Sequence, residues 1–523
     1  MDMDENVVRL AKPVKKGLGR FLFSRLFLII ALLLLQVLML AGLYLWAASK
    51  HSAILSLHWI FSFVMIVYLF NNEMDASAKL SWMLIMSLVP TTGALLLLFT
   101  QSNAGHRRLS RMVKKQIDGT KSALVQDPEL VTDLSTDGEG TDDLRRYLNR
   151  SGCFPIYEKT QVTYFPLGEN MFEAMLEELA KAEKFIFMEY FIITEGYMWG
   201  RILDILIRKV KEGVDVRVMY DGMCETSSLP ADYWKLLEKQ GIRARAFSPI
   251  MPIVSSHYNY RDHRKILVID GRTAFNGGIN LADEYINRIE RFGHWKDTAV
   301  MLKGPAVRSF TLMFLQMWNL HEADPDYETF LSAPVSEVPD AKGYVMPYAD
   351  SPLDNYKAGE AVYTDILNRA TDYVHIMTPY LILDGELEAA LRFAALRGVD
   401  VRLILPGIPD KKAAYSLAKT HYRALHKAGV RIYEYTPGFV HAKVFVSDDE
   451  KAVVGTINLD YRSLYHHFEC ATYMYRTDCI PQIEEDFRKT LEKCREVTEE
   501  DIKKEKLSYR VTGDLLKWTA PLM

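Results

Sequence analysis

Apolar residues are distributed in two different ways along the chain. Near the N-terminus they form three long runs, at about residues 26–48, 53–70 and 80–100. A helix over the first run would be about 35 Å long, enough to cross the hydrocarbon core of a bilayer. After about residue 150, short β-branched runs alternate with stretches of helical periodicity. The pattern therefore predicts N-terminal transmembrane helices followed by an α/β region.

The charges around the apolar runs leave the membrane topology open. Six Lys or Arg residues lie in the cationic segment 1–25, and six more follow the third run, within residues 101–121. Three full crossings would separate these clusters, against the rule that cationic flanks stay cytoplasmic. The acidic loop 71–79 suits the outer face, so we expect a hairpin over 53–100 that returns the α/β region to the cytoplasm. The first run is then a third span or a tilted, partly inserted helix; it is too long for a cleaved signal peptide.

The α/β region is internally duplicated. Residues 213–218, Gly-Val-Asp-Val-Arg-Val, are matched by residues 398–403, Gly-Val-Asp-Val-Arg-Leu, and each follows a helical pattern and predicts a strand. Residues 241–243 are matched in the same way by residues 429–431. We therefore expect a polar, acidic linker over 101–149, a first domain over 150–335, a second over 340–485 and a helical extension over 486–523.

Composition narrows the class of protein. The chain has 523 residues, of which 25% are charged, and a formal net charge of −4. It lacks the basic excess of a dedicated nucleic-acid-binding domain, so we expect no nucleic-acid partner. The five cysteines are odd in number and form no CxxC pair, which indicates free thiols in a reducing compartment.

One polar motif occurs once in each repeat. Each copy reads HxKxxxxD and then places a Gly and an Asn, with the Asn seventeen positions after the His. Alternate residues of a strand face the same way, so the His and Lys of each copy project together. The residues after the following strand would let backbone amides approach an anion. The copies comprise His263, Lys265, Asp270, Gly277, Gly278 and Asn280, and His441, Lys443, Asp448, Gly455, Thr456 and Asn458.

Two such copies around one point predict a pocket for a phosphodiester. One imidazole can attack phosphorus while the other protonates the departing alkoxide, and the Lys and Asn side chains stabilise the nonbridging oxygens. The chain shows no HExxH, Cys-rich or Mg²⁺-type carboxylate spacing. We therefore expect neither a metal nor another cofactor.

Four carboxylates accompany the motifs. We include Asp270 and Asp448 among the candidate catalytic residues because they belong to the motifs. The favoured interpretation, however, is that each carboxylate stabilises a turn and pairs locally. Asp297 and Glu469 each follow a motif histidine by about thirty residues. We expect each to hydrogen-bond the far ring nitrogen of a histidine and fix its tautomer; the alternative is a surface carboxylate.

With these motifs the sequence resembles the phospholipase D superfamily and, more closely, the membrane-anchored bacterial cardiolipin synthases. The resemblance covers nearly the whole chain. It implies two tandem phospholipase D-like α/β/α domains that share one active site. It also implies transfer of a phosphatidyl group between two phosphatidylglycerol molecules, which gives cardiolipin and glycerol. The matching segments are 81–82, 90–93, 259–265, 295–297, 378–380, 438–443 and 455–463.

The resemblance further implies that His263 is the nucleophile and His441 the acid/base. The chain departs from the family pattern at Gly278, where Ser is common, at Asp449, where Gly often follows the motif, and in its additional first apolar run. Hydrolysis, a phospholipase D activity with water as acceptor, is the second enzymatic interpretation. An inert membrane scaffold, or a nuclease or nucleic-acid tether with the same fold, is disfavoured by the intact motifs and modest charge. A homodimer is compatible with the sequence.

Overall fold

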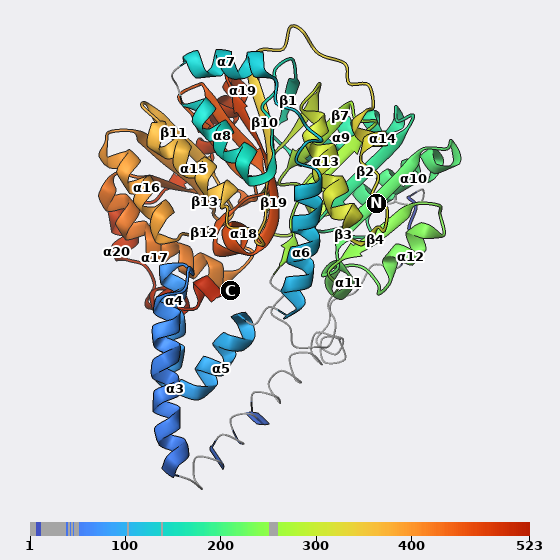
Figure 1. The fold of residues 1–523 in the computed structure, drawn as a ribbon. Helices are drawn as coiled ribbons and strands as arrows, with labels where there is room; N and C mark the ends of the chain where they lie inside the picture. The colour runs from blue at the N-terminus through green and yellow to red at the C-terminus, as the bar shows by residue number, and fades with distance from the viewer. Residues whose placement is uncertain are drawn as a thin grey trace.

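Two mixed β-sheets with helices on both faces form the body of the protein, and a group of helices projects from one end of it (Figure 1). This architecture is seen in a computed structural model that describes residues 7–11, 38–39, 42, 45–46, 52–101, 104–137, 140–249 and 260–522.

The first sheet has seven strands in the order β1-β9-β7-β6-β2-β3-β4. The strands β2, β3 and β4 run parallel, and the other neighbours pair antiparallel. All residues of β2 and β6 are buried, as expected of strands that are covered on both faces. The bounds are β1 (Gln161–Phe165), β2 (Phe185–Tyr190), β3 (Asp215–Asp221), β4 (Arg243–Phe247), β6 (Lys265–Ile269), β7 (Thr273–Gly277) and β9 (Ala299–Lys303).

The second sheet repeats this order as β10-β19-β17-β16-β11-β13-β14, and β20 extends its far edge. The matched order confirms the duplication, and the predicted strands after Gly213 and Gly398 occupy equivalent places as β3 and β13. The bounds are β10 (Tyr344–Asp350), β11 (Tyr373–Met377), β13 (Asp400–Pro406), β14 (Arg431–Tyr435), β16 (Val444–Ser447), β17 (Lys451–Gly455), β19 (His467–Tyr475) and β20 (Cys494–Glu496).

Helices join the two repeats into one body. Helix α13 (Val307–Trp318) contacts β2 and β6 of the first sheet and β10 of the second. All of its residues except Arg308 are buried, because the helix lies between the repeats. The other body helices are α9 (Gly168–Ala180), α10 (Tyr197–Lys211), α11 (Cys224–Ser227), α12 (Tyr233–Glu238), α14 (Glu328–Leu331), α15 (Ala358–Arg369), α16 (Gly385–Leu396), α17 (Lys412–Ala428), α18 (Tyr461–Tyr465) and α19 (Ile480–Leu491), with short 3₁₀ turns η2 (Asp283–Ile286) and η3 (Asn319–His321).

Flanking segments pack on this body. Residues 101–149, expected as a linker, contribute α6 (Ala104–Gly119), α7 (Pro128–Asp137) and most of α8 (Thr141–Gly152). Helix α6 contacts α13, and α8 contacts β10. The C-terminal extension contains α20 (Glu499–Lys503), α21 (Leu507–Lys517) and η4 (Ala520–Leu522), and α21 lies against α17.

The projecting helices are α3 (Ser52–Phe70), α4 (Ala76–Leu88) and α5 (Pro90–Gln101), which pack around a small core that includes Trp82 and Met86. The predicted run 80–100 is therefore not one helix. It breaks at Val89, where φ is −138° and ψ is 74°, because proline disfavours helical backbone at the preceding residue. The predicted span 26–48 lies almost wholly outside the described residues. Among the helices of the described ranges, none is both long and apolar enough to cross a membrane.

Candidate active site

Two short parallel strand pairs connect the repeats at the motifs. Strand β5 (Arg261–Asp262) of the first repeat pairs with the start of β19, and β15 (Gly438–Val440) of the second pairs with β8 (His294–Lys296). Each motif histidine follows one of these strands. The His263 N–H donates to the Phe468 carbonyl at 2.9 Å, and the His441 N–H donates to the Lys296 carbonyl at 2.7 Å. Each repeat therefore holds the motif backbone of the other.

The histidine–carboxylate pairs cross between the repeats. The His263 Nδ1 lies 2.9 Å from both carboxylate oxygens of Glu469, and the His441 Nδ1 lies 2.6 Å from Asp297 Oδ2. Both carboxylates are fully buried, and the two imidazoles are 6% and 8% exposed. These are the hydrogen bonds expected of Asp297 and Glu469, with partners exchanged between repeats. A carboxylate that accepts from Nδ1–H leaves Nε2 as the free, basic ring nitrogen.

The two lysines lie directly beside the histidines. The Lys265 Nζ donates to the His263 carbonyl at 2.6 Å. The Lys443 Nζ donates to the His441 carbonyl and lies 2.9 Å from that ring's Nδ1. Lys265 and Lys443 are only 2% and 1% exposed. The paired His and Lys of each motif thus project together, as their i, i+2 spacing predicts.

Burial and mutual repulsion weaken the positive charge of this cluster. Burial, assisted by Lys265, His467 and Lys443, holds the pKa of His263 well below its usual range. Burial and then Lys443 lower the pKa of His441 to about 4. Burial also lowers the pKa of Lys265 to about 8 and that of Lys443 to about 7. Charges from the two repeats repel one another here, so the binding of an anion between them would be favourable.

The two motif asparagines are not equivalent in the structure. Asn280 accepts from the Ile192 N–H at 3.0 Å and donates to the Tyr285 hydroxyl at 2.8 Å, so its amide already has partners. The Oδ1 of Asn458 is buried and has no hydrogen-bond partner within the described part of the chain. The structure therefore distinguishes two residues that the motif makes identical.

The amides after the motif strands correct one expectation. We expected backbone N–H groups at Gly277, Gly278, Gly455 and Thr456 to approach an anion. The strands do end at Gly277 and Gly455, but three of these amides donate to backbone carbonyls in or directly before neighbouring strands. Because these N–H groups already donate within the protein, they are not available to an anion. The bonds are Gly278 to Thr298 (3.0 Å), Gly455 to Lys443 (3.3 Å) and Thr456 to Cys470 (2.9 Å).

These residues instead make room for the carboxylates. A Cβ at Gly278 would lie 2.1 Å from Asp297 Oδ1, so a side chain there would displace the partner of His441. A Cβ at Gly277 would lie 2.4 Å from the carbonyl oxygen of Thr298. In the second repeat, the Thr456 hydroxyl donates to Glu469.

Asp270 and Asp448 make the contacts of turn-stabilising carboxylates. Both have a left-handed backbone, with φ of 54°. Among the described residues, neither is hydrogen-bonded to a motif His or Lys. Asp270 accepts from the amides of Glu183, Lys184 and Phe185, and Asp448 from those of Thr371, Asp372 and Tyr373.

A third imidazole at the site was missed by sequence reasoning. His467 has its ring centroid 5.3 Å from that of His263 and its Nδ1 3.5 Å from Glu469 Oε1. It is 8% exposed, and neither ring nitrogen has a hydrogen-bond partner in the described part of the chain. The pair His466-His467 directly before Phe468-Glu469 was the available signal. Only the pairing of β19 with β5 shows which of the two lies beside His263.

Two clusters bring potential metal ligands together within the described residues. His263, His467 and Glu469 form one, and three carboxylates form the other: Asp384 and Glu386, together with Glu360 from an earlier helix. Sequence spacing gave no sign of this second cluster. In the first, the ammonium groups of the neighbouring lysines oppose a cation. In the second, the Tyr465 hydroxyl and Lys357 already bond the acids.

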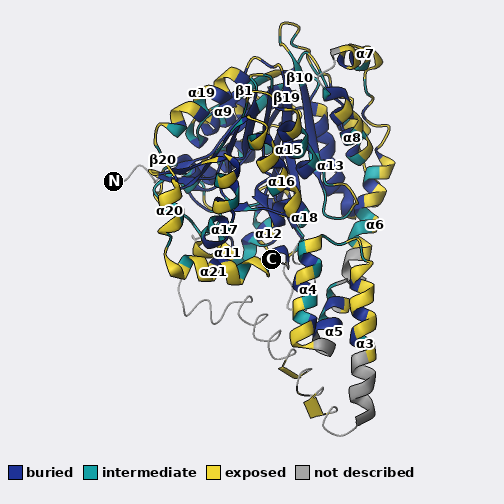
Figure 2. Cartoon of the chain, turned by 90° about the vertical axis from the view of Figure 1, so that its left-hand side faces the viewer, coloured by how far each residue is buried: buried dark blue, intermediate teal, exposed yellow. Residues whose placement is uncertain are grey.

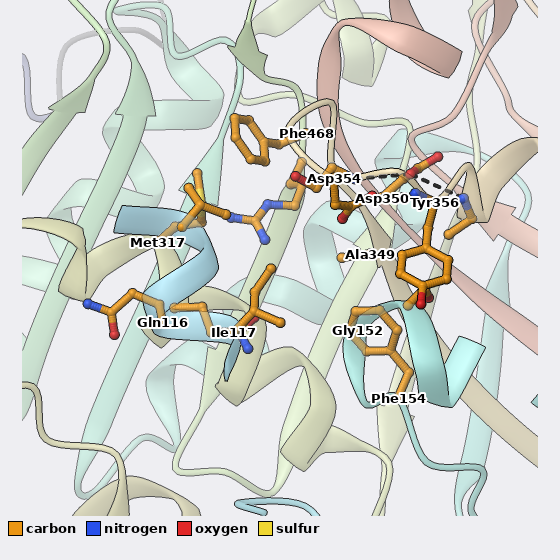
Figure 3. Close-up of a pocket in the computed structure, with 16 residues that line it drawn as sticks. Gln116, Ile117, Gly152, Phe154, Met317, Ala349, Asp350, Asp354, Tyr356 and Phe468 are labelled. Atoms are coloured by element: carbon orange, nitrogen blue, oxygen red, sulfur yellow. Dashed lines mark hydrogen bonds between the residues drawn. The ribbon is translucent and has the colours of Figure 1, made fainter. Parts of the chain in front are cut away.

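A small cavity lies next to the site, between α6, α8, α13 and the segment from β10 to α15 (Figure 3). Phe468 and Arg264, which neighbour the catalytic residues in sequence, are among its lining residues. Asp350 also lines the cavity, and its carboxylate accepts from the amides of Ala358 and Gly359 at 3.2 and 2.8 Å. These bonds fix the start of α15, so Asp350 has a structural role here.

In this protein the two α/β repeats pair strands with one another, and each motif histidine bonds a carboxylate of the other repeat. This arrangement is that of tandem phospholipase D-like proteins. The sequence profile described as "Cardiolipin synthase, PLD-like domain" matches residues 175–318 and 363–491. The chain belongs to this cardiolipin synthase family of the phospholipase D superfamily, and it is an enzyme of the phosphatidyltransferase class.

Similar proteins cover most of the chain. A cardiolipin synthase of Alkalihalophilus pseudofirmus is 31% identical over 482 residues, 91% of this chain and 95% of that protein. Cardiolipin synthase 2 of Bacillus cereus is 33% identical over 463 residues, 87% of this chain and 88% of its own. The crystal structure of phosphatidylserine synthase from Haemophilus influenzae matches with a TM-score of 0.54 at 15% identity, over 73% of this chain and 97% of that one. At that identity the likeness shows the fold alone.

Proposed function

We propose that the protein is a cardiolipin synthase that transfers a phosphatidyl group between two phosphatidylglycerol molecules through a phosphohistidine intermediate. The observation that carries the proposal is the exchange of carboxylates between the repeats, which brings both imidazoles and both ammonium groups to one junction. Membership of the cardiolipin synthase family supports the substrate class. The position of each group suggests how the reaction proceeds.

In the first half-reaction, the Nε2 of His263 attacks the phosphorus of phosphatidylglycerol. The bond from phosphorus to the glycerol oxygen breaks as the new P–N bond forms. The bound phosphodiester anion raises the pKa of His441, and the imidazolium form of His441 gives a proton to the departing alkoxide. Glu469, which bonds the Nδ1 of His263, orients the nucleophile and offsets the charge that develops on its ring. The products are free glycerol and a phosphatidyl group on His263.

In the second half-reaction, the terminal hydroxyl of another phosphatidylglycerol attacks the same phosphorus. His441, now uncharged, removes the proton of that hydroxyl, and the P–N bond breaks to regenerate His263. Asp297, at 2.6 Å from His441 Nδ1, stabilises the imidazolium that forms. Lys265 and Lys443 stabilise the nonbridging oxygens, and the carboxamide NH₂ of Asn458 donates to a diester oxygen and orients the diester.

The lysines predict a pH dependence. The ammonium forms attract the phosphodiester, and burial sets their pKa at about 7 for Lys443 and about 8 for Lys265. As pH rises through this range the lysines lose charge, so kcat/KM should fall by up to about tenfold per pH unit for each group required. A bound anion raises both pKa values, so the fall in kcat should occur at higher pH.

The measurement is a pH–rate profile on mixed micelles of phosphatidylglycerol. Arginine stays charged throughout, so the Lys443→Arg variant should move the alkaline limb upward whatever its maximal rate. A wild-type kcat/KM that stays flat to pH 9, well past the pKa of about 8 for Lys265, would contradict a role for these charges in binding.

Product analysis tests the function and separates it from the alternative, phospholipase D-type hydrolysis. Purified full-length protein with phosphatidylglycerol as the sole lipid should release one glycerol for each cardiolipin formed. Glycerol labelled in the headgroup should divide equally between free glycerol and cardiolipin. Formation of phosphatidic acid in place of cardiolipin would show that water is the acceptor and that the transferase proposal is wrong.

We further propose that the enzyme works as a multi-pass protein of the bacterial cell membrane, with the catalytic repeats in the cytoplasm. The apolar runs at 26–48, 53–70 and 80–100 support insertion. In addition, α4 turns Leu80, Leu84 and Leu88 outward, with exposed fractions of 68%, 42% and 70%. This apolar stripe at the end of the body would bring the site close to lipid substrates (Figure 2).

A further inference from the structure

Helix α21 has two apolar faces, and the fold uses only one of them. On the inner face Gly513 is buried, and a Cβ there would lie 2.5 Å from the Ser416 carbonyl oxygen of α17. The Tyr509 ring packs against Tyr415, with centroids 5.8 Å apart. Leu516 also packs into a small core on this side. Close contact with α17 therefore fixes how α21 is rotated about its axis.

The outer face carries a stripe that the protein leaves in contact with solvent. Leu507, Val511, Leu515 and Trp518 have exposed fractions of 72%, 47%, 62% and 37%. Their spacing of four, four and three residues places them in one row. At about 100° per residue, this row is roughly opposite the face that packs on α17. Packing within the chain does not explain these four apolar side chains; we call them the α21 stripe.

The α21 stripe ends close to the apolar surface of the projecting helices. The Ser81 hydroxyl of α4 donates to the Trp518 carbonyl, and η4 contacts α4. Next to Ser81 begins the outward row of Leu80, Leu84 and Leu88. Figure 2 shows α21 at the end of the body from which α3, α4 and α5 project. The two rows therefore meet at one corner of the molecule.

The residues that flank the α21 stripe indicate what covers it. Lys506, Arg510 and Lys517 are exposed on or next to α21, against one exposed acid of the helix, Asp514. An apolar row bordered by cations is the pattern of a helix that lies flat in the headgroup region of an anionic membrane. The row ends in Trp518, a residue type that favours the membrane–water boundary.

We propose that α21 is an interfacial helix that lies on an anionic phospholipid surface with the α21 stripe among the acyl chains. The proposal rests on the proposed function for the identity of the lipid, phosphatidylglycerol. The helix packs on α17 of the second repeat and is tied to α4, so it would hold the catalytic body at a fixed height and tilt over the bilayer. It would act beside the N-terminal apolar segments as a second, independent contact with lipid.

Site-specific fluorescence tests this contact in the full chain. Cys153 and Cys494 are half-buried and the other cysteines are buried, so a Cys153→Ser/Cys494→Ser background allows one added cysteine to be labelled. An environment-sensitive dye is attached at Leu515→Cys, in the α21 stripe, or at Thr512→Cys, an exposed matched control off the stripe. The protein is reconstituted in phosphatidylglycerol vesicles that contain a lipid with a quencher on its acyl chain.

We expect a blue shift and at least threefold stronger quenching for the dye at position 515 than at position 512. Equal, weak quenching at both positions would overturn the proposal. So would a blue shift at 515 that arises without phospholipid and grows with protein concentration, because it would mark a contact between copies of the chain. Vesicles of a zwitterionic phosphatidylcholine should give weaker quenching at 515, and unchanged quenching would refute the role of the flanking cations.

A kinetic comparison gives a second readout. Leu515→Asp should raise the apparent KM for phosphatidylglycerol in vesicles about tenfold while leaving kcat in detergent-mixed micelles unchanged; Thr512→Asp should change neither. An unchanged vesicle KM for Leu515→Asp would contradict the proposal. Repeating the quenching in a His263→Ala background separates the two ideas, because lipid contact by α21 does not require transfer. Failure of transfer alone would then count only against the proposed function.

Discussion

Asp297→Asn is expected to disable His441, although the two residues belong to different repeats. Asp297 Oδ1 accepts from the Thr298 N–H at 2.8 Å, and Oδ2 bonds His441 Nδ1. In the variant the amide oxygen stays with the Thr298 N–H, so the amide NH₂ faces the imidazole. It would donate to Nδ1, force the wrong tautomer and remove the charge that stabilises the imidazolium. By analogy with the same change in a catalytic triad, turnover should fall about 10³- to 10⁴-fold.

A double-mutant cycle is the sharpest measurement of this crossed pairing. If Asp297 acts through His441, Asp297→Asn should cost little further activity in a His441→Ala background and nearly its full effect in a Glu469→Gln background. Full additivity of Asp297→Asn with His441→Ala would mean that the bond between them has no role in catalysis. Thermal unfolding of each variant checks that loss of a buried carboxylate has not simply unfolded the protein.

His263→Ala is expected to abolish cardiolipin formation, with a loss of at least about 10⁴-fold in kcat. No phosphohistidine should be trapped on this variant, because its nucleophile is absent. In His441→Ala, a phosphatidyl donor with an acidic leaving group needs no proton from the enzyme. The intermediate should then form on His263 and persist, and mass spectrometry of the peptide that contains His263 should detect it.

His421→Ala is the matched control for this prediction. His421 is also buried and has its Nδ1 2.7 Å from a carboxylate, that of Glu388, but it lies on α17 away from the motifs. Loss of this pair should lower thermal stability without changing the transfer rate. A phosphohistidine that maps to His441 in the wild-type enzyme would exchange the two roles. Transfer retained at more than about one hundredth in His263→Ala would exclude His263 as an essential nucleophile.

Local sequence patterns were sufficient to predict the equivalent strands and turns of the two repeats. The matched runs after Gly213 and Gly398 predicted two equivalent strands, since β propensity and burial depend on neighbouring residues. The strands after Lys265 and Lys443, and the turns at Asp270 and Asp448, followed from the same kind of local signal. Duplication of a motif with His and Lys at i, i+2 also predicted which side chains would project together.

The break at Pro90 shows the limit of hydropathy alone. The run 80–100 contains no charged residue, yet the backbone restriction before proline divides it into α4 and α5. The expected anion-binding amides failed for a different reason. Gly278 and Gly455 donate to carbonyls of the residues directly before neighbouring strands, and which strands are neighbours is a property of the sheet. Composition and spacing do not contain that information.

The duplicated motifs were enough to predict two repeats, each with a His, a Lys and an accompanying acid. Which acid bonds which histidine could be read only from the folded chain. His263 bonds an acid 206 residues away, and His441 bonds one 144 residues away. Both contacts arise because β5 and β8 of the first repeat pair with β19 and β15 of the second. The same pairing places His467 beside His263. A periodic pattern shows which side chains share a face of their own strand. The residue that each side chain meets across an interface depends on the packing of the whole chain.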